Sequence, residues 1–307
     1  MSQINPICAT TFDASAGLRR TFQQQNTKVN GILFDISFTP TAEYMSGDKF
    51  AILRDIFFDL NLRQGGAAGG VGGSDLLIDS ISLYQILEYS DYIAGVSMSA
   101  TPMTAGTKWR VSGYLPIGFF GLGARDSLDL EIYLDHVIPA GISVDLVVST
   151  VFLRDQLSLI RRYTTAKPTG SDQSYTDVIG IYFDCDSETK KSITVRDEVN
   201  DNAVVSIEDA IAYSNSTGRF ELFTRFGEVY SDVYGVGQNV TVKCPKIETS
   251  GGEEDKSAEM LIVSYVYDTA FLKASAGAFD ASSELLYTKI RDAGGEKAAY
   301  LSALGII

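Results

Sequence analysis

The sequence predicts an all-β protein built from two tandem jelly-roll β-barrels, with short helical insertions and a helical C-terminal tail. Two observations lead to this prediction. Segments that alternate apolar and polar residues, as half-buried strands do, dominate the chain, whereas helical patterns are scarce. Several of these segments also occur twice in the same order, which indicates an internal duplication.

The predicted strands are rich in Val, Ile, Phe and Tyr, which suit a half-buried pleated surface. In the segment 126–135, Leu128, Leu130 and Ile132 alternate with polar residues, so this strand has one buried face. The connecting segments are rich in Gly, Ser, Asp and Pro. The predicted strands are 31–38, 50–62, 126–135, 142–153, 178–186, 192–197, 218–226, 239–244 and 258–268.

Two ten-residue segments are the predicted helical insertions and also form a repeat. SLYQILEYSD, residues 82–91, aligns without gaps on SIEDAIAYSN, residues 206–215. Both segments begin with serine, and both carry a Tyr-Ser pair at their eighth and ninth positions, Tyr89-Ser90 in the first copy. Close substitutes occupy three further positions: Leu83/Ile207, Leu87/Ile211 and Asp91/Asn215. One such match alone is weak, but it predicts an element that each half of the chain contains once.

Strand segments repeat as well. IFFD, residues 56–59, matches IYFD, residues 181–184, and LVVS, residues 146–149, matches LIVS, residues 261–264. Strands draw on few residue types, so any single pairing is weak. The ordered set of strand and helix matches, with small differences in loop length, predicts a duplicated β domain.

An antiparallel sheet of this size must bury its faces and protect its edges, so each copy is predicted to fold as a sandwich or barrel. A jelly roll fits best, because its long connections admit a short helix. An immunoglobulin-type sandwich is the alternative, although neither half has a Cys…Trp…Cys spacing and Trp109 is the only tryptophan. The predicted domains are an N-terminal arm (1–30), a first barrel (31–157), a second barrel (158–275) and a helical tail (276–307).

The ends and the middle of the chain differ in composition from the barrels. The first 30 residues are polar and predict an arm that orders on assembly. Residues 157–174 have the Lys, Pro, Thr, Gly and Ser content of a linker. The tail over 281–307 predicts two helices separated at Gly294-Gly295, and its apolar last residues suggest that it packs on a barrel or a neighbouring subunit.

Charge and composition exclude several classes of protein. The net charge of −14 argues against a broad basic face, so no direct nucleic-acid binding is expected. No stretch is long and apolar enough for a transmembrane helix, and the N-terminus lacks the pattern of a signal peptide. The three widely spaced cysteines, Cys8, Cys185 and Cys244, predict neither a disulfide framework nor a zinc site.

No motif predicts a catalytic or cofactor-binding residue, so the protein is not expected to be an enzyme. GGAAGGVGG (65–73) lacks the ending of a P-loop and the helix that follows a dinucleotide fingerprint, which favours a plain loop. His136, the only histidine, has no nucleophile motif beside it and is interpreted as a loop or packing residue. The acidic runs 184–188 and 253–255 match no EF-hand, although calcium between acidic subunits stays open and metal ligands stay unknown.

Two jelly rolls in tandem within one acidic chain of this length resemble the major capsid proteins of tailless icosahedral phages with an internal membrane. Corticovirus-like phages and similar lipid-containing phages with single-stranded DNA come closest in length. The resemblance covers about residues 31–270 and rests on architecture, including the IFFD/IYFD pair and the paired helices. It implies a homotrimer in which six barrels form a pseudo-hexameric capsomer, and capsomers that tile an icosahedral shell.

The resemblance also implies partners and a location. The partners are neighbouring capsomers, other virion proteins such as penton and membrane proteins, and the internal virion membrane, which the termini could contact through Leu18, Phe22 and the neighbouring arginines. The expected location is the virion capsid, after synthesis in the host cytoplasm.

Two other classes of function stay open. A phage spike or receptor-binding protein with tandem β domains would also be acidic and non-catalytic. A jelly-roll carbohydrate-binding protein or glycosidase is the second alternative; a glycosidase needs two carboxylates at a suitable separation, and its cleft usually contains several tryptophans. The capsid hypothesis predicts a trimer that assembles further, whereas a lectin predicts a monomer or small oligomer that binds glycans.

Overall fold

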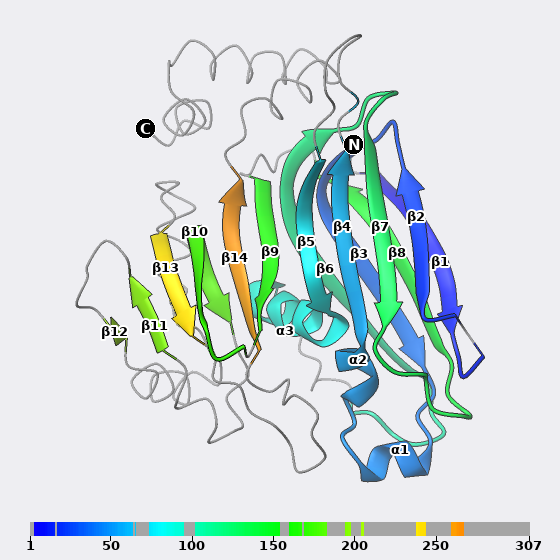
Figure 1. Ribbon diagram of the computed structural model, residues 1–307. Helices are drawn as coiled ribbons and strands as arrows, with labels where there is room; N and C mark the ends of the chain where they lie inside the picture. Colours follow the sequence, from blue (N-terminus) through cyan, green and yellow to red (C-terminus); the bar gives the residue numbers. More distant parts are fainter. Residues whose placement is uncertain are drawn as a thin grey trace, which may run out of the picture.

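The computed structural model describes residues 3–153 except 16, 64, 66–73 and 95–101, residues 160–182 except 168, and the segments 194–197, 204–205, 238–243 and 259–266. This part of the chain is mainly β-strand, with three short helices (Figure 1). The elements of the first half are β1 (Gln3–Phe12), β2 (Arg19–Gln24), β3 (Lys28–Phe38), α1 (Ala42–Ser46), α2 (Ala51–Asp55), β4 (Ile56–Arg63), β5 (Ser74–Ser82), α3 (Leu83–Ala94), β6 (Trp109–Gly121), β7 (Ser127–Leu134) and β8 (Val144–Phe152).

The first eight strands form a jelly roll. They pair in a nested series, β1 with β8, β2 with β7, β3 with β6 and β4 with β5, each pair antiparallel. This is one long antiparallel ribbon rolled up on itself, and it gives two sheets with the orders β1-β8-β3-β6 and β2-β7-β4-β5 (Figure 1). The predicted all-β class and the jelly roll are therefore confirmed for the first half.

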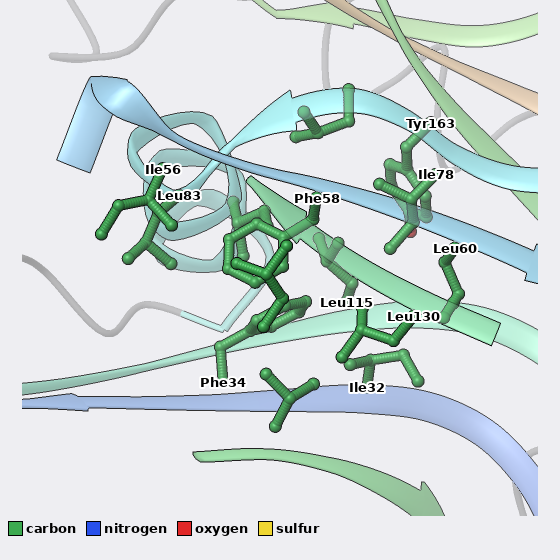
Figure 2. Packing of buried hydrophobic residues seen from close by; sticks show 14 of the residues in the cluster. Ile32, Phe34, Ile56, Phe58, Leu60, Ile78, Leu83, Leu115, Leu130 and Tyr163 are labelled. Atoms are coloured by element: carbon green, nitrogen blue, oxygen red, sulfur yellow. The ribbon is translucent and has the colours of Figure 1, made fainter. Parts of the chain in front are cut away.

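The core lies between these two sheets, where the inward-facing side chains of both meet (Figure 2). The alternation of apolar and polar residues in β7 corresponds to an alternation in burial, since Leu128, Leu130 and Ile132 are buried. Phe34 of β3 and Phe58 of β4 meet edge to face, with ring centroids 5.0 Å apart. Aromatic pairs in this geometry add to the stability that burial of apolar area provides.

The second half repeats the nested pairing as far as its strands are described. Its elements are β9 (Ile160–Ala166), β10 (Asp172–Tyr182), β11 (Thr194–Asp197), β12 (Val204–Val205), β13 (Gln238–Lys243) and β14 (Met260–Val266). β9 pairs with β14, β10 with β13, and β11 with β12. The sheet order β9-β14-β10-β13 thus parallels the order β1-β8-β3-β6 of the first half. The LVVS and LIVS segments fall in β8 and β14, which hold the same place in the two orders.

The IFFD/IYFD match does not join equivalent strands. Residues 56–59 begin β4, which lies between β5 and β7, whereas Ile181 and Tyr182 end β10, which lies between β14 and β13. The strand in the place of β10 is β3, which carries the similar segment GILFD at 31–35, compared with GIYFD at 180–184. The match between 56–59 and 181–184 was wrong because strand sequences are built from few residue types.

Three sequence-based boundaries need correction. The predicted arm over 1–30 contains β1 and β2, which pair with β8 and β7 as outer strands of the roll, so the first barrel begins at Gln3 rather than at residue 31. Much of the predicted linker over 157–174 is strand, because β9 covers residues 160–166 and β10 begins at Asp172. The predicted strand 50–62 begins with helix α2, and β4 starts at Ile56.

Several predictions fall on other parts of the chain. The second helical segment, 206–215, the strand 218–226 and the C-terminal tail, 276–307, lie outside the described residues. In the part that the structure describes, no helix has the length and apolar content that a membrane span requires. The predicted boundary between the barrels, at residues 157 and 158, stays a prediction, with β9 starting at Ile160.

Candidate site at the seam between the two halves

Two of the residues that the sequence singled out for chemistry, His136 and Cys8, lie in the part of the chain that the structure describes. His136 follows β7 at the surface, with its side chain 61% exposed and its Nδ1 3.2 Å from the Asp55 Oδ1. Cys8 is buried in β1, and burial raises the pKa of its thiol, so it stays protonated and unreactive. The other two cysteines lie outside the described residues. Of these residues, the structure thus describes an exposed histidine after β7 and a buried thiol in β1.

The start of the glycine-rich loop is held by one buried carboxylate. The backbone N–H of Gly65 donates to Asp126 Oδ1 (3.1 Å), and the backbone N–H of Gly123 donates to Asp126 Oδ2 (2.9 Å). Asp126 therefore ties the root of this loop to the turn before β7. The residues 66–73 themselves lie outside the part of the chain that the structure describes.

Metal binding stays an open prediction. Both acidic runs, 184–188 and 253–255, lie outside the described residues. Within the described ranges, no group of three or more His, Cys, Asp or Glu side chains could hold a metal ion.

The most extensive arrangement of polar and aromatic side chains in the described chain lies where its two halves meet. We call this contact, between α3, β5 and β6 of the first half and β9 and β10 of the second, the seam. Helix α3 lies at its centre. Ser82 caps this helix: its Oγ accepts from the backbone N–H of Gln85 (3.2 Å), and Gln85 Oε1 accepts from the backbone N–H of Ser82 (3.1 Å). This reciprocal capping box satisfies two backbone donors at the start of the helix. The serine that begins both copies of the helical repeat thus has a structural role in the first.

The Tyr-Ser pair of the repeat makes two hydrogen bonds from α3, one to each half of the chain. Ser90 Oγ accepts from the backbone N–H of Tyr114 in β6 (2.8 Å), which satisfies a donor on the edge of the four-stranded sheet. Tyr89 Oη accepts from Nη1 of Arg161 in β9 (3.1 Å). One turn of α3 therefore joins the first roll to the first strand of the second half.

Three tyrosine rings gather around this contact. The ring of Tyr89 lies 5.5 Å from that of Tyr163 and 4.8 Å from that of Tyr182, both in edge-to-face geometry. The hydroxyl of Tyr163 donates to the carbonyl of Pro116, which is another backbone group on the edge of β6. Arg161 is 6% exposed, so the whole arrangement is buried.

Next to this buried contact, the two halves share one sheet. β5 and β9 run parallel and pair over two residue pairs, which extends the sheet across both halves to ten strands (Figure 1). Thr165 Oγ1 donates to the carbonyl of Ser80 (3.0 Å), and Arg162 Nε donates to the carbonyl of Leu76 (3.0 Å). Arg162 Nη2 also lies 3.6 Å from Asp75 Oδ1 at the surface.

The strand β5 carries an irregularity where β9 joins it. Ser80 has a φ of 54°, in the left-handed region, and its backbone N–H donates to Asp59 Oδ1 (2.7 Å). Burial raises the pKa of Asp59, the hydrogen bond from Ser80 lowers it, and the nearby charges of Asp79 and Glu131 raise it. The raised pKa of Asp59 follows from its burial in the sheet, and by itself it assigns no acid–base chemistry to this carboxylate.

The seam therefore holds the two halves together through backbone pairing, aromatic packing and one buried charge. The sequence analysis missed Arg161 and Tyr163, because it assigned their segment to a linker. The Tyr-Ser pair was visible as a repeat, but its two contacts lie 72 and 24 residues away in the chain. Only the arrangement of the fold brings these groups together.

Comparisons with known proteins give no relative by sequence. No family model matches the chain. No curated protein matches it either.

Solved structures do match. A chain from the atomic structure of Sulfolobus Turreted Icosahedral Virus is 10% identical, and the match covers 99% of this chain and 99% of that chain with a TM-score of 0.51. The crystal structure of the STIV MCP is 9% identical over 86% of this chain and 96% of that chain, with a TM-score of 0.48. The major capsid protein P2 from Bacteriophage PM2 is 10% identical over 86% and 97%, with a TM-score of 0.43.

At these identities a likeness shows the fold. The chain shares its fold, over nearly its whole length, with the chain from Sulfolobus Turreted Icosahedral Virus. The predicted all-β jelly-roll class is thus supported both by the strand pairing of the first half and by this likeness.

Proposed function

We propose that this chain is a major capsid protein, a structural subunit that builds a virion shell by self-association. The observation that carries the proposal is the shared fold with a chain from an icosahedral virus over 99% of both chains. The net charge of −14 fits a protein that must stay soluble until it assembles.

The duplicated fold gives the proposal its geometry. Three chains around a threefold axis present six similar rolls, because each chain contributes two, and this closed arrangement makes a pseudo-hexameric capsomer. Such capsomers tile an icosahedral shell. The seam supports this arrangement, since the buried Arg161 contact and the shared sheet make each chain a single block of two rolls.

Further partners follow from the same proposal. The capsomer contacts its neighbours, other virion proteins such as penton and membrane proteins, and the internal virion membrane through its termini. The protein is made in the host cytoplasm and resides in the virion. Its work is done by shape and self-association, without a catalytic step.

Light scattering coupled to size exclusion tests the proposal. The expected result is a stable trimer, about three times the chain mass of 33.3 kDa. Addition of calcium should give larger particles that electron microscopy can image, if acidic subunits are bridged by divalent ions, and EDTA should reverse this growth.

A monomer at high protein concentration would overturn the stable trimer. In that case a glycan array separates the alternatives: specific glycan binding indicates a carbohydrate-binding protein, and adsorption to host cells without it indicates a spike protein.

A further inference from the structure

A buried arginine lies where the two halves of the chain meet. Arg161 of β9 is 6% exposed, and a guanidinium group stays charged at any physiological pH. A buried charge is costly unless its hydrogen bonds are satisfied. The halves can therefore dock closely only in an arrangement that supplies acceptors to this side chain, and Tyr89 Oη is one of them, 3.1 Å from Nη1.

The groups around Arg161 come from both halves. The first half supplies Tyr89 from α3 and Tyr114 from β6, whose hydroxyl interacts electrostatically with Arg161. The second half supplies Tyr163 from β9 and Tyr182 from β10. We call Arg161 and these four tyrosines the Arg161 cluster. Because neither half contains the whole set, the cluster forms only when the halves are docked.

The shape of the cluster depends on two glycines. A Cβ atom on Gly31 in β3 would lie 2.3 Å from the ring of Tyr114, and a Cβ on Gly180 in β10 would lie 2.5 Å from the hydroxyl of Tyr182. Both tyrosine rings thus lie over glycines, on strands that hold the same place in their sheets. Any other residue at either glycine would push a ring out of its present position.

The other contacts across the seam all join β9 to the single strand β5, including the hydrogen bonds from Thr165 to the Ser80 carbonyl and from Arg162 to the Leu76 carbonyl. They therefore fix the angle between the halves less strictly than the Arg161 cluster does. The β5–β9 pairing covers two residue pairs, and a ladder that short bends and twists readily. The pair of Arg162 and Asp75 is at the surface, where an ion pair contributes little.

We propose that the Arg161 cluster is a latch that fixes the orientation of the second half on the first. Tyr89 is its positioning residue, since its hydroxyl receives the buried guanidinium and its ring contacts the tyrosines of the second half. The latch acts within one chain, so it operates whether or not the chain assembles into a shell.

The latch can be tested by measuring the distance between the halves in solution. Nitroxide labels are attached to cysteines introduced at two exposed positions, Thr21 in β2 and Thr176 in β10, in the full chain with its three native cysteines replaced by alanine. Pulsed electron paramagnetic resonance then gives the distribution of distances between the labels. The parent chain is expected to give one narrow peak.

Two variants that each delete one phenolic hydroxyl form a matched pair. Tyr89→Phe removes the acceptor of Arg161 and is expected to at least double the width of the distance distribution. Tyr44→Phe removes a hydroxyl that donates to the Lys49 carbonyl, outside the Arg161 cluster, and is expected to leave the width unchanged. A single narrow peak in Tyr89→Phe, equal to that of the parent, would overturn the proposal.

A third variant separates orientation from stability. Arg161→Met replaces the buried charge by an apolar side chain of similar length and so removes the cost of burying that charge. The latch predicts a broadened distance distribution at an unchanged or raised melting temperature. An unbroadened distribution in Arg161→Met would count against the latch even if Tyr89→Phe failed to fold.

Discussion

The substitution Ser90→Ala tests whether α3 holds the edge of β6. Ser90 is 2% exposed, and its hydroxyl oxygen accepts from the backbone N–H of Tyr114 at 2.8 Å. Alanine removes the acceptor and leaves the N–H buried without one. α3 lies so close to β6 that a Cβ on Gly113 would be 2.9 Å from Leu87 Cδ2, so a water molecule has little room to replace the hydroxyl.

The expected cost follows from these contacts. A buried donor that loses its partner costs about 1–3 kcal/mol, because its desolvation is no longer offset. The small volume of the hydroxyl adds little to this cost. Ser90→Ala should therefore lower the free energy of unfolding by about 2 kcal/mol, which corresponds to about a 30-fold change in the unfolding equilibrium constant.

Urea unfolding followed by tryptophan fluorescence measures this cost directly. Trp109, the only tryptophan, lies buried at the start of β6 against Phe38, so its emission reports on the strand in question. Ser46→Ala is the control, since the Ser46 hydroxyl is exposed and should matter by less than about 0.5 kcal/mol. A loss in Ser90→Ala no larger than in Ser46→Ala, at an unchanged dependence on urea, would refute the reasoning.

The same urea titration tests three further predictions. Gly31→Ala should cost about 1–3 kcal/mol because its Cβ would lie 2.3 Å from the Tyr114 ring, while Gly17→Ala, with no atom within 4 Å, should change stability by less than about 0.5 kcal/mol; equal effects would contradict this. Phe34→Ala should cost about 3–5 kcal/mol, since the ring is fully buried, and a loss under about 1 kcal/mol would mean that it does not pack as described. Burial raises the pKa of Asp59, so the folded state binds its proton more tightly than the unfolded state, and the resulting stability is present at low pH and lost as pH rises through the raised pKa. Asp59→Asn should therefore be more stable than the parent at pH 7 and lose this advantage as the pH falls toward about 4; an advantage that does not change with pH would show that the carboxylate charge is not its cause.

The sequence predicted best those strands that have one buried face. In β7 the alternating Leu128, Leu130 and Ile132 were sufficient to predict the strand and its buried face, because the apolar residues of the pattern are the buried ones. β1 and β2 were interpreted as an arm, since they lie at the outer side of the roll and present Gln, Arg and Thr to solvent. Their place depends on β8 and β7, which are distant in the chain.

β6 and the seam were missed for different reasons. Pro116 argues against a central strand, but β6 is an edge strand, where a missing N–H is tolerated and the Pro116 carbonyl is bound by Tyr163. Arg161 gave no sign of burial, because an arginine is usually exposed and its acceptor comes from a helix in the other half. The contacts of Arg161 and Pro116 depend on how the two halves of the chain pack together, which local sequence does not show.

The pairing of β1 with β8 constrains the order in which the chain can fold during synthesis. Gln3 pairs with Phe152, so the first strand made has to wait for the last strand of its roll. At about 5–20 residues per second, the ribosome needs roughly 7–30 s to cover that interval. During this time the outer strand has no partner, and the four-stranded sheet cannot be completed. β9 comes after β8 in the chain, so the seam can begin to form only after all eight strands of the first roll have been synthesised. A newly made chain thus has every strand of the first roll available before the first strand of the second half emerges.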